Sequence, residues 1–448
     1  MKKVWNIAFE ISPILAASGS FGDRSGVYRI NYNLIKYLSE YFVAEKLPHQ
    51  IYVYTLNPAL NYNIGLDLNA LLGKSNIHFL KIPYPHGKYL QEYQIFDHAG
   101  IRFIIKWIDQ VIWRPIIENV VFARYLYLIS QEFKAKQVKV VHHSESGFAY
   151  IKNVLNIIHI HDMVPFMFPF WQRPVTIDIH RRKIKFATKK CNAVICISKH
   201  TVKDFVEYAK QYKLPCPPHR VIYLGPEQFP PGDKNNISDI NNSLRASGRR
   251  IILPKKYFLF FGTIEPRKNT TMLISVFDKL KKAGKLAQFD LVLVGGKGWG
   301  KVYDNTKDYL QENYPKSIAS PIILLDFLSD EYLHTLITNS YAVVYPSFYE
   351  GFGLPVLESM QYGIPVITSN NSSIPEVGED ACLYIDPTSP DSLEGALLTL
   401  ASSPKLHKQL ALASKRQAAK FNWQYTAFQT YQYYCELLKP KPTSSIFH

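Results

Sequence analysis

The stretch from residue 341 to residue 358 constrains the fold more than any other part of the chain. It begins with a short apolar run, Tyr341–Tyr345, of the kind that favours a buried strand. Gly351 and Gly353 follow, and glycine lets the backbone approach a ligand closely. Pro355 suits the first turn of a helix, because the N–H that proline lacks has no partner there. The stretch therefore predicts a strand, a tight turn and a helix start that favours an anion.

Two glutamates, Glu350 and Glu358, flank this turn. Glu350 lies in the loop, and Glu358 lies one turn inside the expected helix. An ionised carboxylate accepts hydrogen bonds from several hydroxyl groups at once, so the pair suits a ligand such as a sugar. Two acidic residues at this spacing are weak evidence alone, and an exposed helix position is the plain alternative for Glu358.

With the segments 363–367, 373–381 and 386–387, this block resembles the retaining glycosyltransferases of family 4, also called glycosyl transferases group 1. Their signature places two glutamates around Gly-Phe-Gly-Leu-Pro, and the chain matches it without a gap. The resemblance covers the C-terminal half well and the N-terminal half in patches, and it is closest to bacterial polysaccharide and O-antigen mannosyltransferases. It implies an α/β protein of the GT-B type, in which two Rossmann-like, doubly wound domains face each other across a cleft.

Apolar runs that alternate with helical stretches predict parallel sheets independently of the resemblance. Expected strands of the first half lie at 4–11, 139–142, 156–160, 192–197 and 220–224, with expected helices at 28–38, 184–190 and 200–211. A second series of strands and helices begins at 257–261. The sequence thus describes two copies of one architecture.

The predicted domain organisation follows from these two series and from the resemblance. An N-terminal, acceptor-binding domain is expected at 1–228 and a nucleotide-sugar-binding domain at 255–424. The interval 229–254 between them is polar and rich in turn residues, which predicts a linker. The resemblance implies that a C-terminal helix at 425–448 packs back on the N-terminal domain.

Two adjacent cations, Arg267 and Lys268, follow the expected strand at 257–261. A sugar nucleotide loses a diphosphate when its sugar is transferred, and positive charge at that point stabilises the departing group. A pair of cations on a loop is ordinarily solvated surface. Their place at a strand end favours a site, and the resemblance implies that they grip the donor diphosphate.

His161 directly follows another expected strand, within the pattern His-Asp-x-x-Pro. A histidine in this place is often structural, but a neutral imidazole can also accept or donate a hydrogen bond at a site. The resemblance implies that His161 lies near the reacting sugar, that Glu350 contacts the sugar hydroxyls and that Glu358 contacts the ribose. It also implies further donor-binding positions, Gly26, Phe327, Phe352, Gly353 and Leu354.

The resemblance implies a metal-independent retaining transfer of a hexose, with mannose favoured, from a nucleoside-diphosphate sugar to a glycan or a lipid-linked acceptor. It leaves the base open, as GDP or UDP, and it implies no cofactor. No Asp-x-Asp pair or cluster with metal-ligand spacing stands in the sequence. Two alternatives remain: a nucleotide-sugar epimerase of the same fold, and a non-catalytic sugar-nucleotide-binding protein, which would be expected to lose the glutamates or the cations.

Composition fits a folded, cytoplasmic protein. The 448 residues are 47% hydrophobic and 20% charged, which supports well-formed cores. Five scattered cysteines without a Cys-x-x-Cys pair favour free thiols in a reducing compartment. The N-terminus passes from Met1-Lys-Lys directly into an expected strand, a pattern unlike a signal peptide.

The net charge of +16 suggests an anionic partner. No nucleic-acid-binding motif is present, and an anionic membrane surface is the other candidate. The run at 101–129 is apolar with interspersed basic residues and tryptophans, which is typical of an interfacial helix. A core helix of the N-terminal domain and a general role of the charge in solubility are the plain alternatives.

Overall fold

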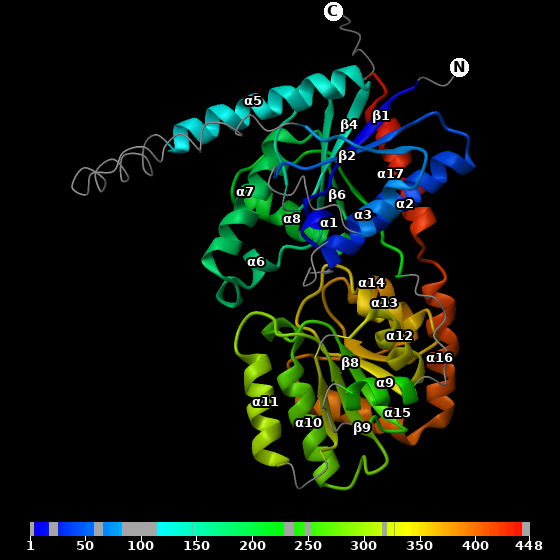
Figure 1. Cartoon of the computed structure of the whole chain (residues 1–448). Helices are drawn as coiled ribbons and strands as arrows, with labels where there is room; N and C mark the ends of the chain where they lie inside the picture. Colours follow the sequence, from blue (N-terminus) through cyan, green and yellow to red (C-terminus); the bar gives the residue numbers. More distant parts are fainter. Residues whose placement is uncertain are drawn as a thin grey trace, which may run out of the picture.

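The computed structural model describes residues 4–17, 26–57, 66–82, 114–145, 147–227, 237–246, 252–315, 320–326 and 328–440. These residues form two parallel sheets, each flanked by helices and lying one above the other in Figure 1. The predicted fold class is confirmed. Of the run at 101–129, which the sequence suggested for membrane binding, residues 101–113 lie outside the described residues, and the rest belongs to helix α5 (Arg114–Ala135), in which Tyr125 and Ile129 are buried.

The N-terminal sheet has the strand order β3-β2-β1-β4-β5-β6-β7. Its strands are β1 (Asn6–Glu10), β2 (Ile51–Tyr54), β3 (Ile77–Phe79), β4 (Val138–His143), β5 (Leu155–Ile160), β6 (Ala193–Cys196) and β7 (His219–Val221). Its helices are α1 (Ser12–Ala17), α2 (Gly26–Ala44), α3 (Leu66–Leu72), α5 (Arg114–Ala135), α6 (Val164–Met167), η4 (Pro169–Trp171), α7 (Pro174–Lys190) and α8 (Lys199–Gln211). The central strands are almost wholly buried, as parallel strands covered on both faces must be.

The C-terminal sheet repeats the same winding with the order β10-β9-β8-β11-β12-β13. Its strands are β8 (Tyr257–Phe261), β9 (Asp290–Val294), β10 (Ile322–Leu325), β11 (Ala342–Tyr345), β12 (Val366–Ser369) and β13 (Cys382–Ile385). The helices of this half are α9 (Ile237–Ala246), η5 (Pro266–Lys268), α10 (Thr270–Lys282), α11 (Val302–Asn313), α12 (Asp330–Asn339), α13 (Leu354–Met360), α14 (Ile374–Gly378), η6 (Glu379–Ala381), α15 (Pro390–Ser402) and α16 (Pro404–Ala418).

Each sheet reverses its winding once, between β1 and β4 in the first and between β8 and β11 in the second. Crevices form beyond the carboxyl ends of parallel strands at such reversals, and ligands bind there. The loops that follow β4, β5, β8 and β11 carry the candidate residues. The topology thus brings segments from both halves of the chain to one place.

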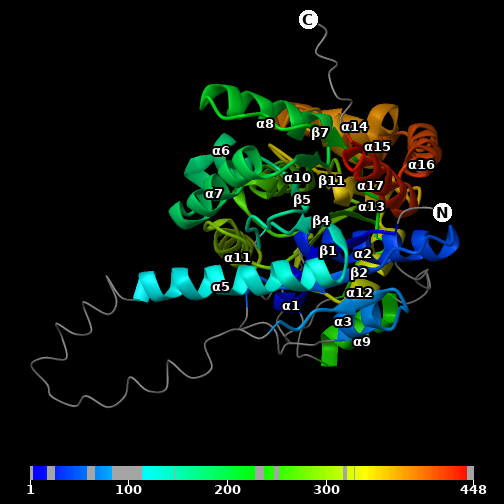
Figure 2. The same cartoon turned by 90° about the horizontal axis from the view of Figure 1, so that it is seen from above.

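The last helix, α17 (Trp423–Leu437), returns to the N-terminal domain, where it packs along α2. It is the red helix beside β1 and α2 in Figures 1 and 2. The buried Trp423 ring stacks on Tyr37, and the Tyr431 hydroxyl lies 3.1 Å from His49 Nε2. These aromatic contacts fix the end of the chain to the first sheet.

The chain crosses between the domains before β8 and again before α17, and the two crossings touch. A Cβ atom on Gly225 would lie 2.4 Å from the backbone nitrogen of Trp423, so only glycine fits this approach. Within the described part of the interval 229–254, which was predicted as a linker, lies helix α9. Ile240 of this helix is fully buried, which gives the segment its own attachment to the core.

Candidate functional site

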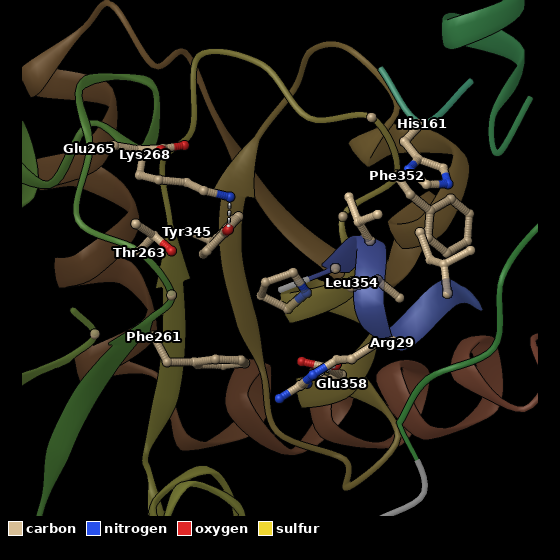
Figure 3. A pocket seen from close by; sticks show the side chains of 18 of the residues that line it. Arg29, His161, Phe261, Thr263, Glu265, Lys268, Tyr345, Phe352, Leu354 and Glu358 are labelled. Carbon is tan, nitrogen blue, oxygen red and sulfur yellow. Dashed lines mark hydrogen bonds and ion pairs between the residues drawn. The ribbon is translucent and has the colours of Figure 1, made fainter. Parts of the chain in front are cut away.

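A cavity of about 750 Å³ lies between the two sheets and draws its lining from both domains. Figure 3 shows its wall, with Arg29 from α2 facing residues of the second domain. Eight of the ten predicted site residues line this cavity: Gly26, His161, Arg267, Lys268, Phe352, Gly353, Leu354 and Glu358. Glu350 lies behind the two cations, and Phe327 lies outside the described residues.

Arg267 and Lys268 form a buried charge cluster with Glu350 and Glu265. Arg267 Nη1 lies 2.8 Å from Glu350 Oε2, and Lys268 Nζ lies 2.7 Å from Glu350 Oε1. A second carboxylate, Glu265, accepts from Arg267 at 2.7 Å. Lys268 also donates to the Tyr345 hydroxyl, as Figure 3 shows. Two cations and two carboxylates therefore hold one another in a fixed arrangement at the cavity wall.

The protonation states of this cluster follow from burial and from mutual charge. Burial would raise the pKa of Glu350, but Arg267 and Lys268 outweigh it and lower that pKa to about 2. Burial lowers the pKa of Lys268, and the neighbouring Arg267 lowers it further, against the opposing effect of Glu350. Glu350 is thus a carboxylate at neutral pH, and its charge offsets the cost of burying two cations.

Local backbone geometry places these side chains. Asn269, which ends the short helix η5, has a left-handed conformation with φ of 56° and redirects the chain into α10. The Phe348 N–H donates to the Arg267 carbonyl at 2.9 Å, which ties the loop after β8 to the loop after β11. Gly353 precedes α13 with φ of 102°, a conformation that favours glycine. Pro355 lies in the first turn of α13, as predicted.

Gly351 brings the two domains into direct contact. A Cβ atom there would lie 2.1 Å from the carbonyl oxygen of His161, so a side chain has no room. The hydroxyl of Thr201, on α8, donates to the Gly351 carbonyl at 3.2 Å. The Gly-Phe-Gly turn of the second domain therefore packs against the His-Asp segment of the first.

Glu358 is buried, with 3% of its surface exposed, and is not the exposed helix residue of the plain alternative. Its partner is Arg29, whose Nη1 lies 3.2 Å from Glu358 Oε1 across the cavity. Arg29 also contacts Asp330 at 3.0 Å. Burial raises the pKa of Glu358, and Arg29 opposes this rise. Figure 3 shows Arg29 and Glu358 side by side at the floor of the cavity.

His161 has a partner that the sequence did not suggest. Its Nδ1 lies 2.7 Å from Glu145 Oε2, and Glu145 also lines the cavity. The buried Lys183 of α7 donates to the other oxygen of Glu145. The sequence does place Glu145 just beyond the end of β4, the strand next to the one that precedes His161, and this position could have identified it as a partner. A single glutamate in a loop is too common for sequence reasoning to select it.

A second carboxylate joins the domains outside the cavity. Glu376, in the Ser-Ile-Pro-Glu segment, accepts from the backbone N–H groups of Lys199 and His200 at 2.8 Å each. These two amides open α8, where a helix has unpaired donors and favours negative charge. The hydroxyl of Tyr223 donates to the same carboxylate at 2.9 Å. Glu376 of the second domain therefore caps the N-terminus of helix α8 in the first domain.

Within the described ranges, no group of three or more histidine, cysteine, aspartate or glutamate side chains is arranged to hold a metal ion. Over the same ranges, no helix has both the length and the hydrophobicity needed to span a lipid bilayer.

Comparison with known families and structures agrees with this geometry. Residues 248–417 match the family model described as glycosyl transferases group 1. By fold, the chain is similar to sucrose-phosphate synthase from Thermosynechococcus elongatus, with a TM-score of 0.64 and 16% identity over 97% of this chain and 99% of that one. It is also similar to HepE of Anabaena, solved with UDP and glucose, with a TM-score of 0.61 and 15% identity over 96% of this chain and all of that one.

The sequence relatives of the chain include two O-antigen mannosyltransferases. O-antigen chain mannosyltransferase B of Escherichia coli is 35% identical over 40% of this chain and 45% of its own length. O-antigen chain mannosyltransferase RfbU of Salmonella typhimurium is 30% identical over 55% of this chain and 61% of its own length. The chain spans about half the length of the curated relatives that it matches.

Proposed function

We propose that this chain, which belongs to the glycosyl transferases group 1 family through residues 248–417 and has the GT-B fold, is a retaining glycosyltransferase. It moves a hexose from a nucleoside-diphosphate sugar to an acceptor hydroxyl. The observation that carries the proposal is the pair Arg267 and Lys268, held by Glu350 at the wall of a cavity between two Rossmann-like domains. A nucleoside diphosphate is the leaving group that such a pair would stabilise.

The charge cluster suits this chemistry because it is organised before the donor arrives. Lys268 is buried, Arg267 is partly buried, and both are already oriented, so little rearrangement is needed when negative charge develops on the leaving oxygen. Glu350 and Glu265 keep the cations in place in the absence of a donor. We expect no metal requirement, because these two cations supply the positive charge that a divalent ion would otherwise supply.

Retention of configuration is part of the proposal. We expect the diphosphate to depart and the acceptor hydroxyl to attack from the same face of the sugar. This needs no carboxylate nucleophile, and Glu350, engaged by two cations, is poorly placed to be one. His161, with one ring nitrogen directed away from Glu145, is expected to contact a sugar or acceptor hydroxyl.

Mannose is the sugar that we propose, with a polysaccharide or glycolipid of the cell surface as the acceptor. The names of the two O-antigen mannosyltransferase relatives support both choices. The epimerase alternative needs no acceptor and is less favoured, because the two named sequence relatives are mannosyltransferases.

We further propose that the enzyme works in the cytoplasm and binds the inner membrane surface peripherally. The support in the described residues is helix α7. Val175 and Ile179 are exposed on this helix, at 61% and 42%. The exposed basic residues Arg182, Lys185 and Lys189 lie on the same face of α7 as Val175. An amphipathic helix of this kind binds anionic bilayers through both its apolar and its charged groups.

The test is transfer itself. The purified chain is incubated with GDP-mannose, UDP-glucose and other nucleotide sugars, with lipid-linked and free glycan acceptors. We expect diphosphate release that depends on the acceptor, and a product whose one-bond carbon–proton coupling at the anomeric carbon matches the donor configuration. Acceptor-independent interconversion of sugars would instead support the epimerase, and binding of a donor without turnover would support the non-catalytic alternative.

A further inference from the structure

Glu145 meets His161 at the edge of the N-terminal sheet. Glu145 follows β4 and His161 follows the neighbouring parallel strand β5, so their side chains emerge on the same edge. Both residues line the cavity, and Glu145 Oε2 lies 2.7 Å from His161 Nδ1. The second ring nitrogen, His161 Nε2, is buried and has no hydrogen-bond partner among the described residues.

The far side of Glu145 is held by cations. Lys183, whose side chain is 1% exposed, donates to Glu145 Oε1, and His180 Nδ1 lies 3.9 Å from the same oxygen. Burial would raise the pKa of Glu145, but the charge of Lys183, together with the hydrogen bond from His161, outweighs it and holds that pKa well below its usual range. Glu145 is therefore ionised, and both of its oxygens can only accept hydrogen bonds.

An acceptor at Nδ1 decides which nitrogen of His161 carries the hydrogen. In the neutral ring, Nδ1 must donate to Glu145, which leaves Nε2 with a free lone pair. A buried acceptor without a donor is costly, so a ligand that supplies a donor there gains binding energy. Sugar hydroxyl groups are such donors.

We propose that Glu145 and Lys183 are positioning residues that fix His161 with its hydrogen on Nδ1, so that Nε2 accepts a hydrogen bond from a substrate hydroxyl. This inference rests on the proposed glycosyl transfer and assigns two residues of the first domain to it. The hydroxyl belongs to either the transferred sugar or the acceptor, and kinetics distinguish these sources. A hydroxyl of the sugar makes His161→Gln raise the donor KM, and a hydroxyl of the acceptor makes it raise the acceptor KM.

The substitution Glu145→Gln gives a sharp structural test. Lys183 can only donate, so it takes the amide oxygen of the new side chain and leaves the amide NH₂ group facing His161 Nδ1. Nδ1 must then accept, and the hydrogen moves to Nε2. Nitrogen-15 spectra of histidine-labelled protein, with His161 assigned from the His161→Gln variant, should show hydrogen on Nδ1 in the wild type and on Nε2 in Glu145→Gln.

Activity provides the second test, through a double-mutant cycle. Glu145→Gln should lower kcat roughly ten- to a hundredfold, the effect of losing one charged hydrogen bond. In the His161→Gln background the same change should cost nothing further, because Glu145 acts through His161. Glu145→Asp, which keeps the charge, should retain more turnover than Glu145→Gln. The exposed Glu207→Gln on α8 is the control with unchanged kinetics.

Two results would overturn the proposal. One is a wild-type spectrum with the hydrogen of His161 on Nε2, which can be measured even if Glu145→Gln does not fold. The other is an equal loss from Glu145→Gln with and without His161. Because the spectrum requires no turnover, an inactive wild type with hydrogen on Nδ1 would count against the glycosyl transfer alone.

Discussion

Arg29 and Glu358 are 329 positions apart in the sequence and form an ion pair with a distance of 3.2 Å across the interdomain cavity. Arg29, from the first domain, thus contacts Glu358, the carboxylate for which the family resemblance implied a contact with the donor ribose. Asp330 binds the other terminal nitrogen of the same guanidinium at 3.0 Å. A donor that uses Glu358 therefore has to share it with Arg29, or to shift Arg29 fully onto Asp330.

The first prediction concerns Glu358. We expect Glu358→Gln to raise the donor KM roughly tenfold or more, because a charged hydrogen bond contributes about 1.5–3 kcal/mol. Turnover at saturating donor should change less. Steady-state kinetics with varied donor concentration provide the measurement, and Glu331→Gln on α12 is the control. An unchanged donor KM would remove Glu358 from the donor site.

The second prediction concerns Glu350. Glu350→Gln leaves Arg267 and Lys268 without their shared carboxylate, and breaking a buried ion pair costs about 3–5 kcal/mol. We expect a lower melting temperature and a loss of kcat of about tenfold or more. A nucleoside diphosphate should stabilise the variant more than the wild type, since its charge replaces the missing one. Wild-type kinetics and melting would show that the cluster is dispensable.

The third prediction concerns the two cations. Arg267→Ala and Lys268→Ala should each weaken donor binding and slow transfer, because each removes a charge-assisted bond to the diphosphate. Calorimetric titration with the nucleoside diphosphate measures the first effect. Lys297→Ala, an exposed lysine that pairs with Asp304, is the matched control. Activity should also survive EDTA, and a loss that magnesium restores would contradict the role given to the cations.

The fourth prediction concerns membrane binding. Reversal of charge at Arg182 and Lys185 should reduce sedimentation with vesicles that contain anionic lipid, and rising salt should weaken binding by the wild type. Reversal at Lys405 and Lys408, exposed on α16 of the other domain, is the control that keeps binding. If both double variants bind equally, α7 does not face the membrane.

The fifth prediction concerns acid stability. Burial lowers the pKa of His142 to about 3 and that of His143 to about 4, from 6.5. The unfolded chain therefore binds more protons below pH 6.5, and stability falls as pH decreases from 6.5 towards these values. Each histidine should cost about 1 kcal/mol between pH 7.5 and 5.5. Urea unfolding should show a shallower pH dependence for His143→Gln than for the wild type, and an equal dependence would contradict the prediction.

Sequence reasoning pointed to several residues that line the cavity, because they lie at predictable strand ends. His161 follows β5 and Arg267 follows β8, and parallel strands end at one edge of a sheet. The buried strands could also be predicted, because burial on both faces of a sheet favours apolar residues. The turn at Gly353 could be predicted because a left-handed backbone conformation favours glycine.

What the sequence could not supply were contacts between distant segments. The ion pair of Glu358 with Arg29, the hold of Glu145 on His161 and the capping of α8 by Glu376 each join positions whose spacing follows no local period. They depend on how the two domains pack, and the same applies to α17, whose aromatic residues do not reveal that their partner is α2.

The contact of Gly225 with Trp423 has a mechanical consequence. Because the chain passes between the domains at two adjoining places, the second domain is connected to the first by two neighbouring segments and not by a single linker. Two such connections act as a hinge. They allow the domains to rotate about the line that joins the connections, and they resist twisting and separation of the domains. If the cleft opens, we expect a rotation about this line, which would bring His161 and Arg267 back to the same relative position on closing.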